Sequence, residues 1–217
     1  MWIVQVIAYV LAAVLFGTPI ATAIHEFGHF IACRRLGIPV KAVRVGGWPR
    51  WRWYICGVPW YLGFPTNLVG RGGVTEPEWP SDRTLWVKMF ASGPRMSAWA
   101  ALVCFVAMFA GVVYVLPLFL VAAPLFLANT LQWLGNYGYG GNREPSDGLG
   151  ILLAQADPTF KSPSVGAPPL VDESSAVYQA AMHSVGHGRW AFGFYGLAVF
   201  LLGFAVIALY LVLAHIR

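Results

Sequence analysis

Long stretches without a charged side chain constrain the fold of this sequence more than any other feature. Residues 1–24, 96–142 and 190–214 contain no Asp, Glu, Lys, Arg or His. A helix of about 20 apolar residues crosses the hydrocarbon core of a bilayer, and the second stretch is long enough for two such helices. Charged residues make up 11% of the chain, whereas soluble domains carry about 25%. The sequence therefore predicts an all-α polytopic membrane protein with about four transmembrane helices.

The limits and direction of these spans follow from prolines and basic residues. The predicted spans cover residues 2–36, 85–116, 118–135 and 190–214. Pro117 is the expected turn between the second and third spans, with Pro124 as the alternative. Lys and Arg concentrate on the cytoplasmic side of membranes. This arrangement leaves only Arg217, of 14 Lys and Arg residues, outside. We therefore expect a multi-pass protein of a prokaryotic plasma membrane with both termini outside.

The pentapeptide His25-Glu26-Phe27-Gly28-His29 directly follows the first uncharged stretch. On a helix, positions i and i+4 lie on one face, so His25 and His29 can hold one metal ion together. Glu26 then lies beside the open position of the metal, where a water would bind. Ionisable groups next to a membrane-length apolar segment are costly and usually functional. Imidazole ligands favour zinc, and the pattern predicts a metal site toward the cytoplasmic end of the first span.

A catalytic zinc ion normally has three protein ligands and one open position. Among the acidic residues, Asp147 is the strongest candidate for the third ligand. It lies between Pro145 and Gly148 in a glycine-rich segment that returns to the same membrane side as His25. Irregular backbone at membrane depth is tolerated where it lines a cavity inside the protein.

Residues 38–69 differ from both a membrane helix and an ordinary loop. Valines and aromatic residues give residues 40–55 strand propensity, and Gly46-Gly47 punctuates them as a turn. We expect a small membrane-associated β-hairpin there. It either anchors the chain at the lipid interface or offers an edge strand beside the metal site, and the sequence leaves both readings open. A polar loop follows, in which Ser81 or Asp82 is expected to cap the next helix.

Other polar patterns have simpler interpretations. His183 and His187 share the i, i+4 spacing but lack an adjacent glutamate, so a solvated or interfacial pair is expected. Cys33, Cys56 and Cys104 are scattered and form neither a disulfide framework nor a zinc-knuckle spacing. The net charge of +5 does not indicate nucleic-acid binding, because the basic residues cluster beside apolar spans.

Three motifs together resemble the site-2 protease family of intramembrane zinc metalloproteases. They are the pentapeptide His25-Glu26-Phe27-Gly28-His29, the pair Gly93-Pro94 with Ser97, and Pro145-Ser146-Asp147-Gly148. They occur in the order of the family and cover its three-helix core, roughly residues 5–155. Two positions depart from the family pattern. Ser97 stands where many members have asparagine, and the asparagine expected before the Asp-Gly pair is Asn136 or, alternatively, Asn142.

The resemblance implies a set of residue roles. His25, His29 and Asp147 would hold one zinc ion, and Glu26 would be the general base. The substrate would be a membrane-embedded or membrane-apposed segment, cut near the cytoplasmic face. The remaining motif residues would position the substrate: Gly93, Pro94, Ser97 and Asn136.

The expected organisation is a minimal form of this family. Residues 1–156 form the protease core, 157–189 a polar cytoplasmic connector, and 190–217 the fourth transmembrane helix. Within the core, the hairpin and loop of residues 37–84 are too short for a PDZ domain, and no CBS domain is expected after the last span.

Two other functions would account for part of this pattern. A membrane metal transporter or sensor would also carry intramembrane His and Asp residues, but it does not need Glu26, and transporters usually show paired repeats. An inactive pseudoprotease that binds helices would be expected to lack Glu26 or a ligand, and all are present.

Overall fold

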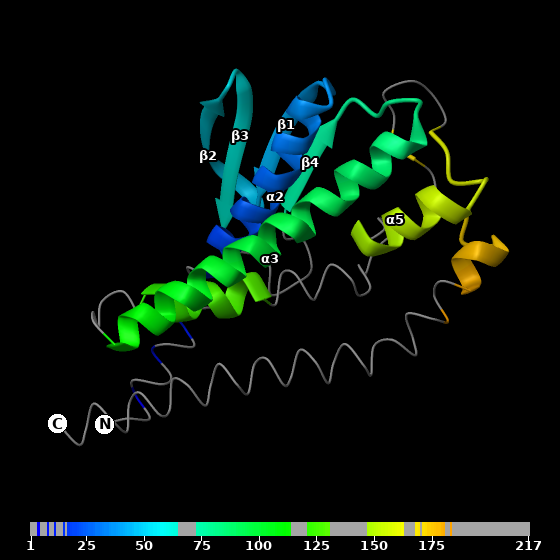
Figure 1. Cartoon of the computed structure of the whole chain (residues 1–217). Helices are drawn as coiled ribbons and strands as arrows, with labels where there is room; N and C mark the ends of the chain where they lie inside the picture. Colours follow the sequence, from blue (N-terminus) through cyan, green and yellow to red (C-terminus); the bar gives the residue numbers. More distant parts are fainter. Residues whose placement is uncertain are drawn as a thin grey trace.

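The computed structural model describes residues 17–64, 73–113, 121–130, 147–162, 168–169 and 171–180, with the single residues 4, 8, 11, 15 and 183. Its elements are the helices α2 (Thr18–Arg35), α3 (Arg83–Val113) and α5 (Asp147–Ala156) and the strands β1 (Val40–Val45), β2 (Gly47–Ile55), β3 (Val58–Phe64) and β4 (Gly73–Pro77). A further helix spans Val121–Thr130. The sheet lies along one side of α2, and α3 crosses α2 diagonally (Figure 1).

Helix α2 ends as the sequence predicted. Gly37 adopts a φ of 70°, a conformation that favours glycine. The Gly37 N–H donates to the Arg34 carbonyl, and the Ile38 N–H donates to the Cys33 carbonyl at 2.8 Å. This pair of bonds is the Schellman motif, and Ile38 packs in the same apolar cluster as Cys33. The helix therefore stops within two turns after His29, and the chain turns back along it.

Four strands follow α2 and form one sheet in the order β2-β3-β1-β4. Strands β2 and β3 form a hairpin closed by Cys56 and Gly57, which both have positive φ, at 50° and 79°. Strand β1 pairs in parallel with β3 and antiparallel with β4. The prediction of a hairpin over residues 40–55 was therefore wrong in its pairing, because β3 lies between β1 and β2. The reversal occurs at Cys56-Gly57, whereas Gly46 is a bend between strands that are not neighbours.

One face of the sheet packs on α2. Phe30 of α2 lies in a buried cluster with Val43, Val45, Val58 and Trp60. The Phe30 and Trp60 ring centroids are 5.6 Å apart in an edge-to-face arrangement, a favoured geometry for aromatic pairs. The alternation of strand residues places these apolar side chains on the helix side. The packing fixes the sheet, including β4, directly beside the part of α2 that carries the histidines.

Helix α3 begins where the sequence predicted. The Asp82 carboxylate accepts a hydrogen bond from the Thr84 backbone N–H at 2.8 Å, which satisfies one unpaired donor of the first turn. Among the described residues, one helix is long and apolar enough to cross a membrane, Arg83–Met108 with 26 residues. The predicted second span is therefore a continuous helix up to Val113 in the described part of the chain.

The helices approach each other closely at glycines. A Cβ on Gly28 of α2 would lie 2.6 Å from the carbonyl oxygen of Ser92 in α3, so only glycine fits at this crossing. A Cβ on Gly17 would lie 3.1 Å from the carbonyl oxygen of Pro124 in the helix Val121–Thr130. The same helix packs on α3 through Met108 and Phe126.

Helix α5 packs on the first half of α3. Leu149 and Leu153 share a buried cluster with Trp86 and Phe90. The Arg83 guanidinium donates hydrogen bonds to the carbonyls of Leu153 and Asp157 at the end of α5, where basic groups are favourable. This packing fixes the first residue of α5, Asp147, relative to α3.

The segment after α5 folds back on its end. The Asp157 carboxylate accepts hydrogen bonds from the hydroxyls of Ser175 and Thr159. Burial acts to raise the pKa of Asp157, but these hydrogen bonds outweigh it and lower the pKa. The ionised carboxylate therefore ties residues 171–180 to α5.

The described chain is thus helix-rich with a small four-stranded sheet, where an all-α chain with a two-stranded hairpin was predicted. Parts of the first and third predicted spans, the turn at Pro117 and the whole fourth span lie outside the described residues. The four-span topology and the division into core, connector and last helix therefore stay predictions.

Candidate metal centre

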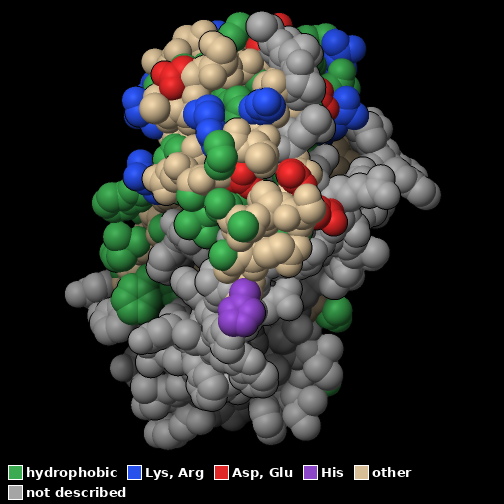
Figure 2. All heavy atoms as spheres, turned by 90° about the vertical axis from the view of Figure 1, so that its right-hand side faces the viewer, with side chains coloured by type: hydrophobic (Ala, Val, Ile, Leu, Met, Phe, Trp, Pro, Cys, Tyr) green, Lys and Arg blue, Asp and Glu red, His purple; other side chains and the backbone are tan. Residues whose placement is uncertain are grey.

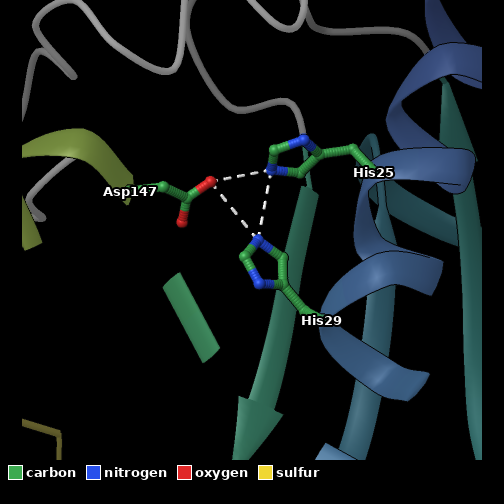
Figure 3. Close-up of side chains that lie close together, drawn as sticks. All are labelled: His25, His29 and Asp147. Atoms are coloured by element: carbon green, nitrogen blue, oxygen red, sulfur yellow. Dashed lines mark hydrogen bonds and ion pairs between the residues drawn. The ribbon is translucent and has the colours of Figure 1, made fainter. Parts of the chain in front are cut away.

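The two histidines of α2 point toward the same place, as their spacing predicts. The Nε2 atoms of His25 and His29 are 3.2 Å apart. The first residue of α5, Asp147, faces both rings (Figure 3). Its Oδ2 lies 2.9 Å from Nε2 of His25 and 3.3 Å from Nε2 of His29. Two residues one helical turn apart thus meet a third that is more than a hundred positions away in the sequence.

The spacing of these atoms suits one metal ion. Donor atoms about 2.1 Å from a tetrahedral zinc ion are about 3.4 Å from each other, close to the separations of the three atoms here. His25 is 3% exposed, and the side chains of His29 and Asp147 are each 13% exposed. Two imidazole nitrogens and one carboxylate oxygen are a ligand set typical of catalytic zinc.

The far side of each imidazole ring has a hydrogen-bond partner. Nδ1–H of His29 donates to the Met89 carbonyl at 2.8 Å. Nδ1 of His25 shares a hydrogen bond with the Ser97 hydroxyl at 3.0 Å. The Met89 carbonyl can only accept, so Nδ1 of His29 carries the proton and the Nε2 lone pair of His29 is available to a metal. The Ser97 hydroxyl can donate or accept, and it fixes the orientation of the His25 ring.

Helix α3 contributes a close backbone approach at Gly93. A Cβ on Gly93 would lie 2.6 Å from Nε2 of His25 and closer still to Nε2 of His29. Pro94 follows inside the helix and is fully buried. Helices α2 and α3 therefore make a close contact at Gly93, directly against the histidine pair.

Ser97 and Asn136 were also predicted to position the substrate. Ser97 is 0% exposed and lies behind His25, so its described contact is with a histidine ring. Asn136, like its alternative Asn142, lies outside the described residues. Their roles toward a substrate stay predictions.

Glu26 lies next to the histidine pair but faces the sheet. It is 4% exposed, and its Oε2 accepts a hydrogen bond from the Thr75 hydroxyl of β4 at 2.7 Å. Sequence reasoning missed Thr75, and it also missed the Met89 carbonyl and Ser92, whose hydroxyl lies 3.2 Å from Nδ1 of His29. No local pattern marks these residues, because each contact joins segments about 50 or more positions apart.

A comparison with protein families matches the model of peptidase family M50 to residues 11–213. The chain belongs to peptidase family M50. This confirms the resemblance to site-2 proteases that its three motifs carry, and it makes the chain a membrane-embedded metallopeptidase in general terms. No curated protein matches the chain.

Proposed function

We propose that this member of family M50 is an intramembrane zinc endopeptidase that cuts transmembrane or membrane-apposed segments near the cytoplasmic face. The observation that carries the proposal is the convergence of His25, His29 and Asp147 beside Glu26. The three donor atoms lie within 4.8 Å of one another. A metal-dependent hydrolase needs an adjacent carboxylate as its general base, whereas transport of a metal ion requires no general base.

The position of the site in the bilayer is inferred from charge. Helix α2 ends with Arg34 and Arg35, within two turns after His29. Lys and Arg side chains gather at the upper end of the face in Figure 2, the end at which α2 terminates in Figure 1. Basic residues favour the cytoplasmic side. We infer that the metal centre lies in the membrane, slightly below its cytoplasmic surface.

Each residue of the site has a separate role in the proposed reaction. His25, His29 and Asp147 would hold the zinc ion, which when bound supplies Lewis acidity and lowers the pKa of a water ligand. The Glu26 carboxylate accepts the proton from the attacking water and returns it to the leaving amine. The hydrogen bonds behind His25 and His29 keep both rings in place during the reaction.

A test of this proposal uses the purified chain in lipid vesicles with a reporter, a single transmembrane helix joining two fluorescent proteins. We expect the reporter to be cut within or beside its helix. A zinc chelator should abolish cleavage and added Zn²⁺ should restore it, because the ligands lie on separate helices and the ion is needed for activity. Mass spectrometry of the fragments locates the cut. Cleavage that persists in the zinc-free protein would refute the proposal, and zinc flux without cleavage would favour a transporter.

A transmembrane helix hides its carbonyl groups in backbone hydrogen bonds, so the substrate must be extended before attack. From the sequence, an edge strand of the 40–55 hairpin beside the metal site was one of two possibilities, and such a strand could capture the extended segment. The sheet order makes β4 the better candidate, because β4 is an edge strand and Thr75 of β4 contacts Glu26. We propose that the substrate adds to this edge as a further strand.

Disulfide cross-linking can test this edge pairing. A cysteine at Val74, which is 41% exposed on β4, is introduced into inactive Glu26→Gln protein and combined with reporters that carry one cysteine each. Cross-linking should recur at every second reporter position, because alternate residues of a strand face the same side. The Glu26→Gln protein with its native Val74 is the background control. Cross-linking that recurs every three to four reporter positions would mean that the substrate stays helical, and it would rule out strand addition.

A further inference from the structure

The Glu26 carboxylate is held by strand β4 as well as by its own helix. Thr75 donates a hydrogen bond from Oγ1 to Oε2 of Glu26 at 2.7 Å. The same hydroxyl lies 3.2 Å from the backbone carbonyl oxygen of Glu26, so the carboxylate is the nearer acceptor. The Thr75 hydroxyl thus contacts both the side chain and the backbone of Glu26.

Thr75 is itself fixed in place by the sheet. It pairs with Val43 of β1, which is 0% exposed. Two residues earlier on the same face of β4, a Cβ on Gly73 would lie 2.7 Å from Cγ of Glu26 and 2.8 Å from its Oε1. The glycine lets the strand backbone lie directly against the Glu26 side chain, and the threonine supplies the donor. Residues 73 and 75 therefore form one surface that surrounds the carboxyl group.

A glutamate side chain has three rotatable bonds, and a buried carboxylate without a donor is costly. General-base catalysis requires the carboxylate to stand within hydrogen-bond reach of the water. We propose that Thr75 is the positioning residue of the general base: its hydroxyl holds one oxygen of Glu26 so that the carboxylate stays beside the histidine pair. This inference rests on the proposed function and adds to it a residue outside the three sequence motifs.

Two variants of Thr75 separate the hydroxyl from the shape of the side chain. Thr75→Val keeps the β-branched shape and the strand propensity but removes the donor. Thr75→Ser keeps the donor and removes the methyl group. With the reporter in vesicles, Thr75→Val should lower kcat about 10-fold, the lower end of the effect of removing a hydrogen-bond partner from a metal ligand, with KM unchanged. Thr75→Ser should recover most of the activity.

A second readout does not depend on activity. In protein labelled with ¹³C-glutamate, the side-chain carboxyl resonance of Glu26 is assigned by its loss in Glu26→Gln. This resonance should shift or broaden in Thr75→Val and stay near its wild-type position in Thr75→Ser. Bound zinc should remain at the wild-type ratio in both variants, because the hydrogen bonds of the Thr75 hydroxyl in the described chain go to Glu26 and not to His25, His29 or Asp147.

The outcomes are distinct. If Thr75→Val has the kcat of the wild type and its Glu26 resonance is not shifted, the proposal is overturned. Loss of zinc in Thr75→Val, or equal losses of activity in the valine and serine variants, would also overturn it, since either result means a role in folding rather than in orienting Glu26. If the wild type fails to cut the reporter, the proposed function fails, and the carboxyl resonance alone then decides whether Thr75 orients Glu26.

Discussion

Glu26→Gln protein is expected to bind zinc like the wild type and to cut the reporter about 100- to 10,000-fold more slowly, the range by which a general base accelerates a reaction. Glutamine has nearly the shape of glutamate but cannot accept the proton from the attacking water. The three donor atoms of His25, His29 and Asp147 are unchanged by the substitution. Zinc content measured by mass spectrometry, together with the cleavage rate, checks both halves of the prediction.

The matched control is Glu78→Gln, the same chemical change at an exposed residue just beyond β4. It should leave zinc content and cleavage rate unchanged. If Glu26→Gln cuts as fast as the Glu78→Gln control, Glu26 is not the general base, and the resemblance of its motif to zinc proteases would not extend to mechanism.

The inactive protein also offers a way to find substrates in the native cell. Because Glu26→Gln should still bind its substrates, uncut membrane proteins are expected to accumulate and to co-purify with it. Comparison of membrane proteomes from wild-type and Glu26→Gln cells would identify them. An unchanged proteome under several growth conditions, with zinc retained, would instead favour the transporter or helix-binding functions.

The parts of the site that could be predicted from sequence are local. His25 and His29 are one helical turn apart, so helix geometry alone brings their rings together. The end of α2 at Gly37 and the cap of α3 at Asp82 are likewise set by residues within a few positions. Asp147 was predicted as the third ligand because it precedes a glycine in a segment expected on the same membrane side as His25. Its carboxylate does lie against both histidine rings.

The parts that could not be predicted depend on long-range contacts or on unusual backbone. The true hairpin turn uses Cys56 at positive φ, a conformation in which glycine, asparagine or aspartate is the usual signal. The parallel pairing of β1 with β3 joins strands that are separated in the sequence by the whole of β2, and no periodicity indicates it. For the same reason, nothing near Thr75 in the sequence indicates that it contacts Glu26.

Gly93→Ala is expected to weaken zinc binding and to lower cleavage about 100-fold, the effect of displacing a reacting group by about 1 Å. The added Cβ would lie 2.6 Å from Nε2 of His25 and closer to that of His29, so the rings or the helices must move apart. Alanine is a better helix former than glycine by about 1 kcal/mol. Helix α3 should therefore remain intact, and the loss would come from the metal centre itself.

Trp99→Leu provides the control, because Trp99 lies in the same helix and is 66% exposed. This substitution removes more atoms than Gly93→Ala adds, yet it should leave zinc titration and cleavage unchanged. Wild-type zinc affinity in Gly93→Ala would show that α3 does not approach the histidines this closely. A loss in Gly93→Ala alone would show that the absence of one side chain on α3 is what makes room for the metal between the helices.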